Sequence, residues 1–278
     1  MELGVMVNIY EDTDIRAAFE VARLAGFTRG QVTSHIHGIT ADEVRLMGLA
    51  ARQTGFHVDA VGCYINPLRL EETTLYGVDG TDWKTLVENM GMMNGVERIV
   101  CWSGTLGKTL DAPNLLNQEE ETFNSLFIAL SGLLEQVRGL PVQIVLEPFT
   151  THVLCDGQLT RRMARKFSFG KVSAALDVAS LISAKSYAAR NTRTQDLVTE
   201  LGPVVGLVHL RDIRLDDQRT LIYERPGAGT LDYGAYLNAI VRHLPEVPII
   251  VEQVLDVHEM RAARTYIEGI LKDYSLHH

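Results

Sequence analysis

Three acidic residues and one histidine each follow a short apolar run of the kind that forms a buried strand. They are Glu147, Asp177, His209 and Glu252, and they come directly after the sequences QIVL, SAAL, GLV and IIV. An ionised carboxylate at the end of a buried strand is costly unless it is paired or coordinates a cation. A strand end that simply faces water explains one such residue, but four at corresponding places favour a shared divalent cation. Carboxylate oxygens with one imidazole nitrogen suit Mn²⁺, Mg²⁺ or Co²⁺, and Zn²⁺ also accepts such ligands.

The elements that must position these residues alternate along the chain, with eight apolar strand-like runs each followed by a helical pattern. The predicted strands are Leu3–Ile9, Gly30–Thr33, Phe56–Cys63, Arg98–Trp102, Val142–Glu147, Val172–Asp177, Val205–Leu210 and Pro248–Glu252. The predicted helices are Asp14–Ala25, Thr40–Thr54, Asp82–Asn94, Gln118–Arg138, Gln158–Lys166, Asn191–Leu201, Tyr233–His243 and Val257–Leu271. Strands that are apolar on both faces are typical of a parallel sheet covered by helices. Two longer segments, Ser103–Asn117 and Asp212–Leu231, are predicted to be linkers.

The order of these elements predicts an α/β fold, a (β/α)8 TIM barrel formed by a single domain over residues 1–278. Such a barrel takes about 250 residues and carries its active site at the carboxyl ends of its strands. The alternative is a doubly wound open sheet, which usually has a glycine-rich turn after its first strand. Here the first strand runs into NIYED at 8–12, which contains no glycine. The barrel is therefore favoured, and in a barrel the four polar strand ends would converge on one face.

Charge and composition exclude several classes of protein. The chain has 26 Lys and Arg against 35 Asp and Glu, a net charge of −9, whereas proteins that neutralise nucleic-acid phosphates usually carry the opposite bias. No apolar run approaches the roughly 20 residues of a membrane span, and the first residues, MELG, lack the basic start of a secretory signal. Three cysteines cannot all pair. We therefore expect a soluble, cytoplasmic protein that acts on a small molecule and binds neither nucleic acid nor a membrane.

Five short motifs resemble the xylose isomerase-like TIM-barrel superfamily, in particular its sugar isomerase and epimerase branch with the tagatose 3-epimerases. They are LEP at 146–148, LD at 176–177, HLRD at 209–212, PGAGTLDY at 226–233 and VE at 251–252. By this resemblance Glu147, Asp177, His209 and Glu252 ligate one divalent metal ion, with manganese as the first expectation, and Glu147 and Glu252 form the acid–base pair. A metal that chelates a ketose carbonyl and the neighbouring hydroxyl stabilises an enediolate, so that two carboxylates can remove and return a proton. The resemblance implies a metal-dependent isomerase or epimerase of a sugar or polyol, and a homo-oligomer, either a dimer or a tetramer.

The resemblance has one clear departure. Family members often carry a histidine three residues after the aspartate of the sixth strand, where this chain has Ser180. The departure leaves open a second reaction class on the same barrel, a metal-dependent dehydratase or lyase of a keto-cyclitol or a dehydroshikimate-like substrate, because that reaction also begins with enolisation. Hydrolysis of abasic DNA, known in the superfamily, needs a histidine-rich zinc site and a basic groove, and the net charge of −9 disfavours it. A barrel that binds a sugar only as a sensor is the non-enzymatic alternative.

Four further residues are candidates for contacting the substrate. His35 follows the second strand, Trp102 ends the fourth, and Arg211 and Arg214 follow the seventh. Each has a plain structural alternative: a solvated loop histidine, an aromatic packed at the barrel rim, an ion pair with a neighbouring carboxylate, and a solvated surface charge. Asp212 is expected to orient His209 or to cap the following loop rather than to bind substrate.

Overall fold

Eight strands form the barrel, and their bounds are β1 (Leu3–Ile9), β2 (Arg29–Ser34), β3 (His57–Gly62), β4 (Arg98–Trp102), β5 (Gln143–Glu147), β6 (Val172–Leu176), β7 (Val205–Leu210) and β10 (Ile249–Val251). The structure is a computed structural model that describes residues 2–93, 95–168 and 170–277, with side chains described to residue 272. The strands are all parallel and follow the order β1-β10-β7-β6-β5-β4-β3-β2, and the barrel closes where β2 pairs with β1. The closed barrel confirms the predicted fold and excludes the doubly wound open sheet.

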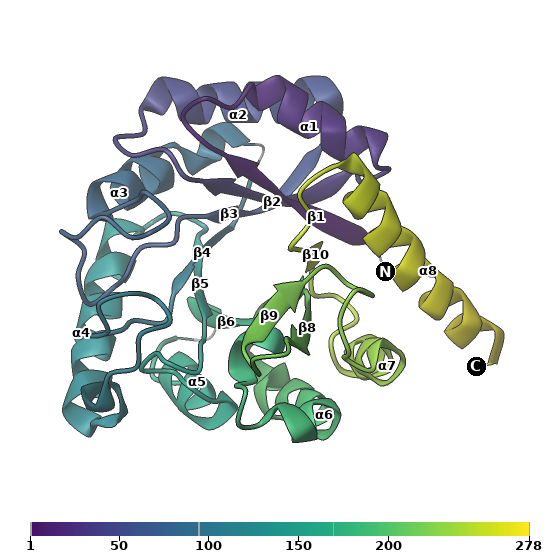
Figure 1. Ribbon diagram of the computed structural model, residues 1–278. Coiled ribbons are helices and arrows are strands. Elements are labelled where there is room, and N and C mark those ends of the chain that lie inside the picture. The colour runs from purple at the N-terminus through teal and green to yellow at the C-terminus, as the bar shows by residue number, and fades with distance from the viewer. Residues whose placement is uncertain (1, 94, 169, 278) are drawn as a thin grey trace.

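Helices surround the barrel (Figure 1). They are α1 (Ile15–Leu24), α2 (Ala41–Thr54), α3 (Gly80–Asn89), α4 (Glu120–Gln136), α5 (Gly157–Ala164), α6 (Arg190–Leu201), α7 (Tyr233–His243) and α8 (Val257–His277). α2 begins with a capping box in which the Glu43 backbone N–H donates to Thr40 Oγ1 (3.3 Å) and the Thr40 backbone N–H donates to Glu43 Oε2 (2.8 Å). The helix ends at Gly55, whose φ of 65° lies in the left-handed region that favours glycine. Both ends of the helix are thus marked by residues within a few positions of each end.

Two apolar layers hold the barrel together. The larger one lies between the strands and the surrounding helices. The smaller one fills the interior with side chains contributed by individual strands, namely Ala60, Tyr64, Val100, Trp102, Val145, Ala175, Leu207 and Ile250. Because side chains alternate across a strand, the next inward position beyond these residues at the carboxyl end of several strands is polar. The polar residues at the carboxyl ends of these strands therefore lie directly above the apolar side chains that fill the barrel interior.

Three predicted element bounds differ in ways that matter. β6 ends at Leu176 and β10 ends at Val251, so Asp177 and Glu252 lie just beyond their strands instead of ending them. The helix predicted over Asp82–Asn94 begins earlier, at Gly80, because Asp79 caps it by accepting from the Thr81 backbone N–H at 2.7 Å. That helix gives way to a 3₁₀ turn over Met90–Met93, and Asn94 lies outside the described residues.

The segment predicted as a linker over Asp212–Leu231 contains an antiparallel hairpin, β8 (Asp212–Leu215) paired with β9 (Leu221–Glu224). The sequence of these two strands is short and partly charged, so it carries no clear strand pattern. The turn between them is held by Asp216, whose Oδ1 accepts from the backbone N–H groups of Gln218 (2.9 Å) and Thr220 (2.7 Å). The hairpin directly follows β7 and stands beside the carboxyl end of the barrel.

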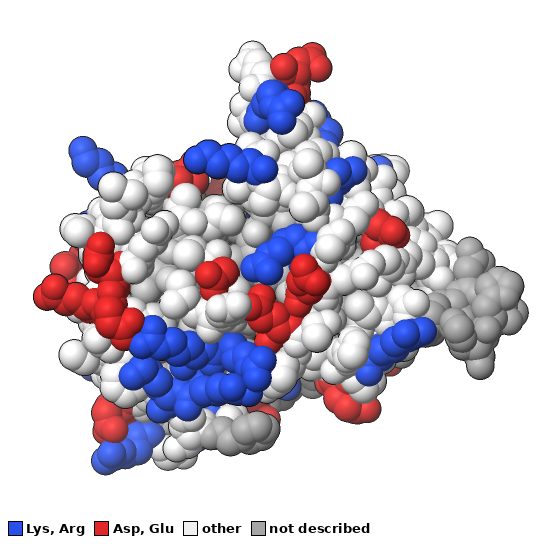
Figure 2. All heavy atoms as spheres, turned by 90° about the horizontal axis from the view of Figure 1, so that it is seen from below, with Lys and Arg blue, Asp and Glu red and all other residues white. Residues whose placement is uncertain are grey.

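The outer surface carries both signs of charge. On the face of the molecule that Figure 2 shows, Lys and Arg side chains gather in one area, with Asp and Glu side chains beside them. This mixture agrees with the net charge of −9 and differs from a continuous basic surface. Among the helices of the described chain, none combines the length and apolarity needed to cross a bilayer.

Candidate active site

The four polar residues predicted at strand ends come from neighbouring strands of the barrel. Glu147 is the last residue of β5, Asp177 follows β6, His209 lies in β7 and Glu252 follows β10. These strands are consecutive in the barrel order, which gathers the four side chains at one side of its carboxyl end. All four are buried, with exposed fractions of 7, 0, 0 and 6% in the same order.

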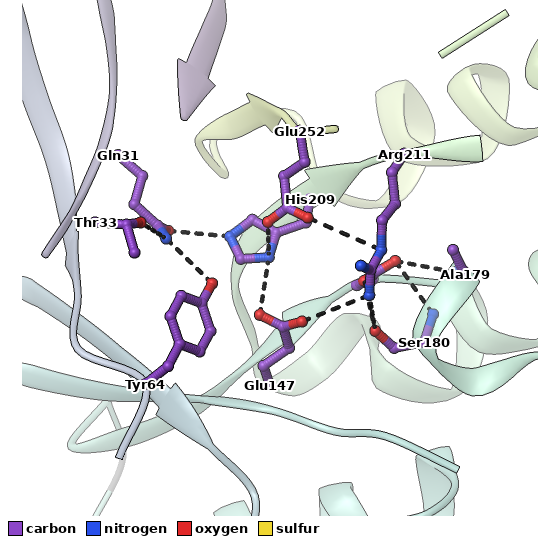
Figure 3. Close-up of polar contacts among 10 residues, drawn as sticks. Gln31, Thr33, Tyr64, Glu147, Ala179, Ser180, His209, Arg211 and Glu252 are labelled. Atoms are coloured by element: carbon purple, nitrogen blue, oxygen red, sulfur yellow. Dashed lines mark hydrogen bonds and ion pairs between the residues drawn. The ribbon is translucent and has the colours of Figure 1, made fainter. Parts of the chain in front are cut away.

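Three of them point ligand atoms at one another (Figure 3). His209 Nδ1 lies 2.8 Å from Glu252 Oε1 and 3.3 Å from Glu147 Oε2. The three residues each offer one atom to a group whose members all lie within 4.8 Å of one another. Each of these three atoms is buried, and none has an aligned hydrogen-bond partner in the part of the chain that the structure describes. Two carboxylate oxygens and a ring nitrogen in this arrangement need a positive charge between them.

The orientation of the His209 ring is set from the opposite side of the barrel. Gln31, on β2, uses its amide Nε2 to donate to Thr33 Oγ1 (3.0 Å) and the Tyr64 hydroxyl (3.2 Å). Its Oε1 is therefore left as an acceptor and lies 3.0 Å from His209 Nε2, which must carry a proton to donate. In the neutral ring the lone pair is then on Nδ1, the atom that faces both glutamates.

The electrostatics of the group show how strongly it attracts a cation. Burial opposes protonation of His209, but the carboxylates of Glu252 and Glu147 outweigh it and raise the pKa of His209 to about 10. Burial likewise opposes ionisation of Glu147, yet His209 and Arg211 outweigh it and lower the pKa of that carboxyl to about 2. For Glu252 burial prevails and raises its pKa. Unless another cation is present, the proton on His209 supplies the positive charge that these carboxylates require.

Asp177 is engaged differently from the other three. Its Oδ2 accepts from the Ser180 hydroxyl and pairs with Arg211 Nη2, both at 2.5 Å, and Arg211 Nη2 also donates to Ser180 Oγ at 2.6 Å. Its Oδ1 accepts from the backbone N–H groups of Ala179 (3.0 Å) and Ser180 (3.4 Å). The structure thus brings Asp177 to the site but directs its oxygens to donors of the chain itself. Asp177 as a fourth metal ligand stays a prediction.

Arg211 is a buried cation at the centre of this arrangement. Its side chain is 11% exposed, and its guanidinium lies 3.8 Å from Glu147 Oε1 and 3.9 Å from Glu252 Oε2. The ring of Tyr223, on hairpin strand β9, covers it at 4.2 Å from the guanidinium carbon to the ring centroid. Charge–ring contacts of this kind stabilise a desolvated guanidinium.

The donor set fits a divalent metal ion. Three carboxylates against one guanidinium leave two surplus negative charges when His209 is neutral, and a divalent ion would neutralise them. Two carboxylate oxygens and one imidazole nitrogen, all buried and without an aligned hydrogen bond to another described residue, form a mixed oxygen and nitrogen site of the type that Mn²⁺ and Mg²⁺ accept. The described residues therefore contain a candidate site for one metal ion, held by Glu147, His209 and Glu252.

A cavity of about 200 Å³ opens onto this group. Its wall includes Glu147, Arg211 and Glu252, together with Met6, Asn8, Tyr10, Thr33, His35, Tyr64, Tyr76, Gln253, Val254 and Leu255. Both glutamates and the guanidinium therefore face space that a small molecule can enter. Cavities of this kind, with a few converging polar groups on aromatic walls, are the usual form of a ligand site.

Of the three remaining predicted contact residues, His35 lines the cavity and Trp102 and Arg214 do not. His35 lines the cavity, and its Nε2 lies 3.0 Å from Asn8 Oδ1. Trp102 ends β4 and is 5% exposed; it packs against Tyr64 and Tyr76 behind the cavity wall. Arg214 lies on β8, where it pairs with Glu224 across the hairpin at 2.7 Å, and the structure does not bring it to the cavity.

Asp212 caps the loop that follows the hairpin. Its Oδ1 accepts from the backbone N–H groups of Ile213 (2.8 Å) and Leu231 (3.0 Å), and its Oδ2 accepts from that of Gly227 (3.2 Å). A side chain at Gly229 would collide with it, since a Cβ there would lie 2.3 Å from Asp212 Oδ1. Of the two roles expected for Asp212, the structure shows the cap, and Gly229 of PGAGTLDY makes room for it.

Sequence reasoning missed Gln31 and Tyr223. Gln31 carried a usable signal, because a glutamine two residues before Thr33 in an otherwise buried strand places two polar groups on one face. Tyr223 carried none, since it belongs to the hairpin that was predicted to be a linker.

The fold has counterparts among solved structures, although no family model and no curated protein sequence matches the chain. A D-psicose 3-epimerase studied in the presence of D-fructose is 14% identical with a TM-score of 0.73, over 98% of this chain and 99% of that one. A xylose isomerase-like TIM barrel protein from Mycobacterium smegmatis in complex with magnesium is 10% identical with a TM-score of 0.66, over 94% and 90%. A mannonate dehydratase from Streptococcus suis serotype 2 is 9% identical with a TM-score of 0.65, over 97% and 92%. This chain has the xylose isomerase-like TIM-barrel fold.

Proposed function

We propose that this protein is a metal-dependent sugar isomerase or epimerase that moves a proton between Glu147 and Glu252. The observation that carries the proposal is the placement of these two carboxylates on either side of His209 Nδ1, at 3.3 and 2.8 Å, with both facing the same cavity. The fold shared with D-psicose 3-epimerase supports this reaction class.

The chain's own residues divide the work. One carboxylate removes the proton from the carbon next to the substrate carbonyl, and the other returns a proton to the opposite face or to the adjacent carbon. Arg211, held by Asp177, offers a fixed positive charge to a substrate oxygen from the cavity wall. A divalent ion held by Glu147, His209 and Glu252, with Mn²⁺ as our first choice, would supply the charge that stabilises an enediolate. Gln31 keeps His209 in the tautomer that such an ion needs.

The dehydratase or lyase reaction is the second candidate, and two observations favour keeping it. Ser180 occupies the place where the resemblance leads us to expect a histidine, and its hydroxyl is bound to Asp177. A mannonate dehydratase also shares the fold. Both reactions begin by removing the same kind of proton, so they differ in whether water leaves afterwards.

The test is solvent-deuterium exchange into a panel of ketoses and keto-cyclitols by the manganese-loaded protein, with product analysis by NMR. A deuterated isomer or epimer supports the proposal, and a dehydrated enone or aromatic product supports the second candidate. The variants Glu147→Gln and Glu252→Gln should each lower the exchange rate at least a hundredfold. The matched control is Glu121→Gln, on an exposed position of α4. Full exchange in both site variants would remove the acid–base pair from the proposal.

A further inference from the structure

A continuous row of aromatic rings runs along one wall of the cavity. We call Tyr10, His35, Tyr76 and Tyr64 the aromatic ladder. Tyr10 and His35 stack at 4.4 Å between ring centroids with 12° between their planes, and His35 and Tyr76 stack at 5.2 Å with 28°. Tyr76 then meets Tyr64 at 5.1 Å. All four line the cavity that Glu147 and Glu252 face.

His35, in the aromatic ladder between Tyr10 and Tyr76, makes a polar contact through the edge of its ring. His35 Nε2 lies 3.0 Å from Asn8 Oδ1, so the two faces of the imidazole are left for Tyr10 and Tyr76. Burial lowers the pKa of His35, which keeps the ring uncharged near neutral pH. The aromatic ladder therefore consists of uncharged rings stacked on one another, and Tyr10 at its exposed end keeps the face away from His35 for the C–H face of a sugar or for another ring.

The aromatic ladder is longer than the enclosed space. The cavity holds about 200 Å³, below the roughly 300 Å³ at which pockets for larger ligands begin, so it encloses little more than one sugar ring. Tyr64, at its inner end, is 4% exposed, whereas Tyr10 at the outer end is 50% exposed. Leu255 also lines the cavity and is 88% exposed, so a second apolar side chain stands at the mouth. An aromatic side chain, Tyr10, and an apolar one, Leu255, therefore lie beyond the space that the reacting ring would fill.

The charges of the cavity wall argue against a phosphate in that outer space. Among the described residues that line the cavity, Arg211 is the only Lys or Arg. Its guanidinium is already bound to Asp177 and Ser180, beside Glu147 and Glu252. A phosphate group carries about two negative charges, and one guanidinium among three carboxylates leaves no surplus positive charge to bind it.

We propose that the substrate is an unphosphorylated keto sugar carrying a second ring, which stacks on the face of Tyr10 turned away from His35 while the reacting ring lies against Glu147 and Glu252. The assignment of the reacting end rests on the proposed function. The second ring is either another sugar or an aromatic aglycone, because both present a face that Tyr10 can cover. Leu255, which lines the same cavity and is exposed, offers it a second apolar contact.

The test is equilibrium binding, measured by titration calorimetry on the manganese-loaded protein. The probes are two matched pairs and one phosphate ester: D-fructose with lactulose, a ketose that carries a second sugar ring; methyl β-D-glucoside with phenyl β-D-glucoside, which carries an aromatic second ring; and D-fructose 6-phosphate. At least one two-ring probe should bind about tenfold more tightly than its one-ring counterpart, as expected for one additional stacked ring. The kind of second ring is identified by which probe, lactulose or phenyl β-D-glucoside, shows the larger increase in affinity. D-fructose 6-phosphate should bind no better than D-fructose.

The variants locate the gain. Tyr10→Ala should remove most of the tenfold advantage of the two-ring probe over its one-ring counterpart, whereas Tyr10→Phe should keep that advantage because the ring remains. Leu255→Ala should remove part of it. The control is Leu24→Ala, a leucine 66% exposed at the end of α1, which should change nothing.

Equal affinity for one-ring and two-ring probes, or tightest binding of the phosphorylated sugar, would overturn this assignment. So would a two-ring advantage that survives Tyr10→Ala. Because these experiments measure binding and the proposed function is tested by deuterium exchange, the two can fail separately. Tight two-ring binding without exchange of any ketose would refute the reaction and leave the stacking subsite in place.

Discussion

Arg211 and Asp177 form a buried ion pair in which Nη2 and Oδ2 are 2.5 Å apart, and the Ser180 hydroxyl contacts both partners. The aspartate is fully buried and the arginine is 11% exposed on its side chain. The pair lies beside Glu147 and Glu252, which face the cavity. The guanidinium is therefore a fixed cation next to the site proposed for the divalent metal ion. Removing either partner would leave the other without its nearest buried counter-charge.

The ion pair predicts a large effect on stability. Asp177→Asn should lower the free energy of unfolding by about 3 to 5 kcal/mol, because Arg211 would stay buried without its carboxylate. Urea denaturation of the metal-free protein measures this. The control is Glu135→Gln, which breaks an exposed pair with Arg138 whose side chains are 63 and 78% exposed and should cost less than about 1 kcal/mol. Similar small losses in both variants would contradict a structural role for the pair.

Mn²⁺ affinity should distinguish His209 from Asp177 as metal ligands. We expect His209→Asn to weaken Mn²⁺ binding at least tenfold, since Nδ1 faces both glutamates and has no other aligned partner among the described residues. Asp177→Asn should weaken it less, because the oxygens of Asp177 already bind Ser180 and Arg211. Titration calorimetry with Mn²⁺ compares the two. Equal losses would show that Asp177 is a fourth ligand and that Arg211 moves away when metal binds.

Gln31 should matter for metal binding although it offers no ligand. Its Oε1 accepts from His209 Nε2 at 3.0 Å and so leaves Nδ1 free for the metal. Outer partners of this kind typically change metal affinity by about 10- to 100-fold, and we expect Gln31→Leu to lower Mn²⁺ affinity by that amount. Gln31→Glu keeps an acceptor and should lose much less. An unchanged affinity in Gln31→Leu would mean that the tautomer is set elsewhere.

The loop after the hairpin requires a glycine at position 229, because there is no space for a Cβ there. A Cβ at Gly229 would lie 2.3 Å from Asp212 Oδ1 and 2.5 Å from the Ile213 carbonyl oxygen. Gly229→Ala should therefore destabilise the protein by about 1 to 3 kcal/mol through overpacking. Gly132→Ala, in the middle of α4 where a Cβ meets nothing within 4 Å, should instead stabilise it by about 0.5 to 1 kcal/mol. Thermal unfolding of both variants gives the comparison, and a neutral Gly229→Ala would refute the close approach.

His152 should make stability depend on pH. It is 1% exposed, and burial lowers its pKa from 6.5 to about 4. Below pH 6.5 the unfolded chain binds a proton at this residue and the native protein does not, so stability is lost as the pH falls toward 4, by up to about 3 kcal/mol. His152→Gln should flatten this part of the pH profile measured by urea unfolding. A profile as steep as that of the unchanged protein would assign the loss to other groups.

The sequence by itself determined the barrel and the places of its polar strand ends. Strands buried on both faces must be apolar throughout, so a residue such as Glu147 or His209 that ends an apolar run is visible without a structure. Local signals were equally readable, because Thr40 and Glu43 have the three-residue spacing of a capping box and that capping box forms. These features depend on neighbours within a few positions along the chain, which is why the sequence reveals them.

Only the tertiary structure decided which of these residues face one another. Gln31 meets His209 across 178 positions of sequence, and the choice of Asp177 between a metal ion and Arg211 depends on where a guanidinium from the next strand comes to lie. The hairpin that brings Tyr223 over Arg211 also escaped prediction, because its short strands are stabilised by pairing with each other and not by a buried apolar pattern. Contacts of this kind follow from the closure of the barrel, and no local pattern records them.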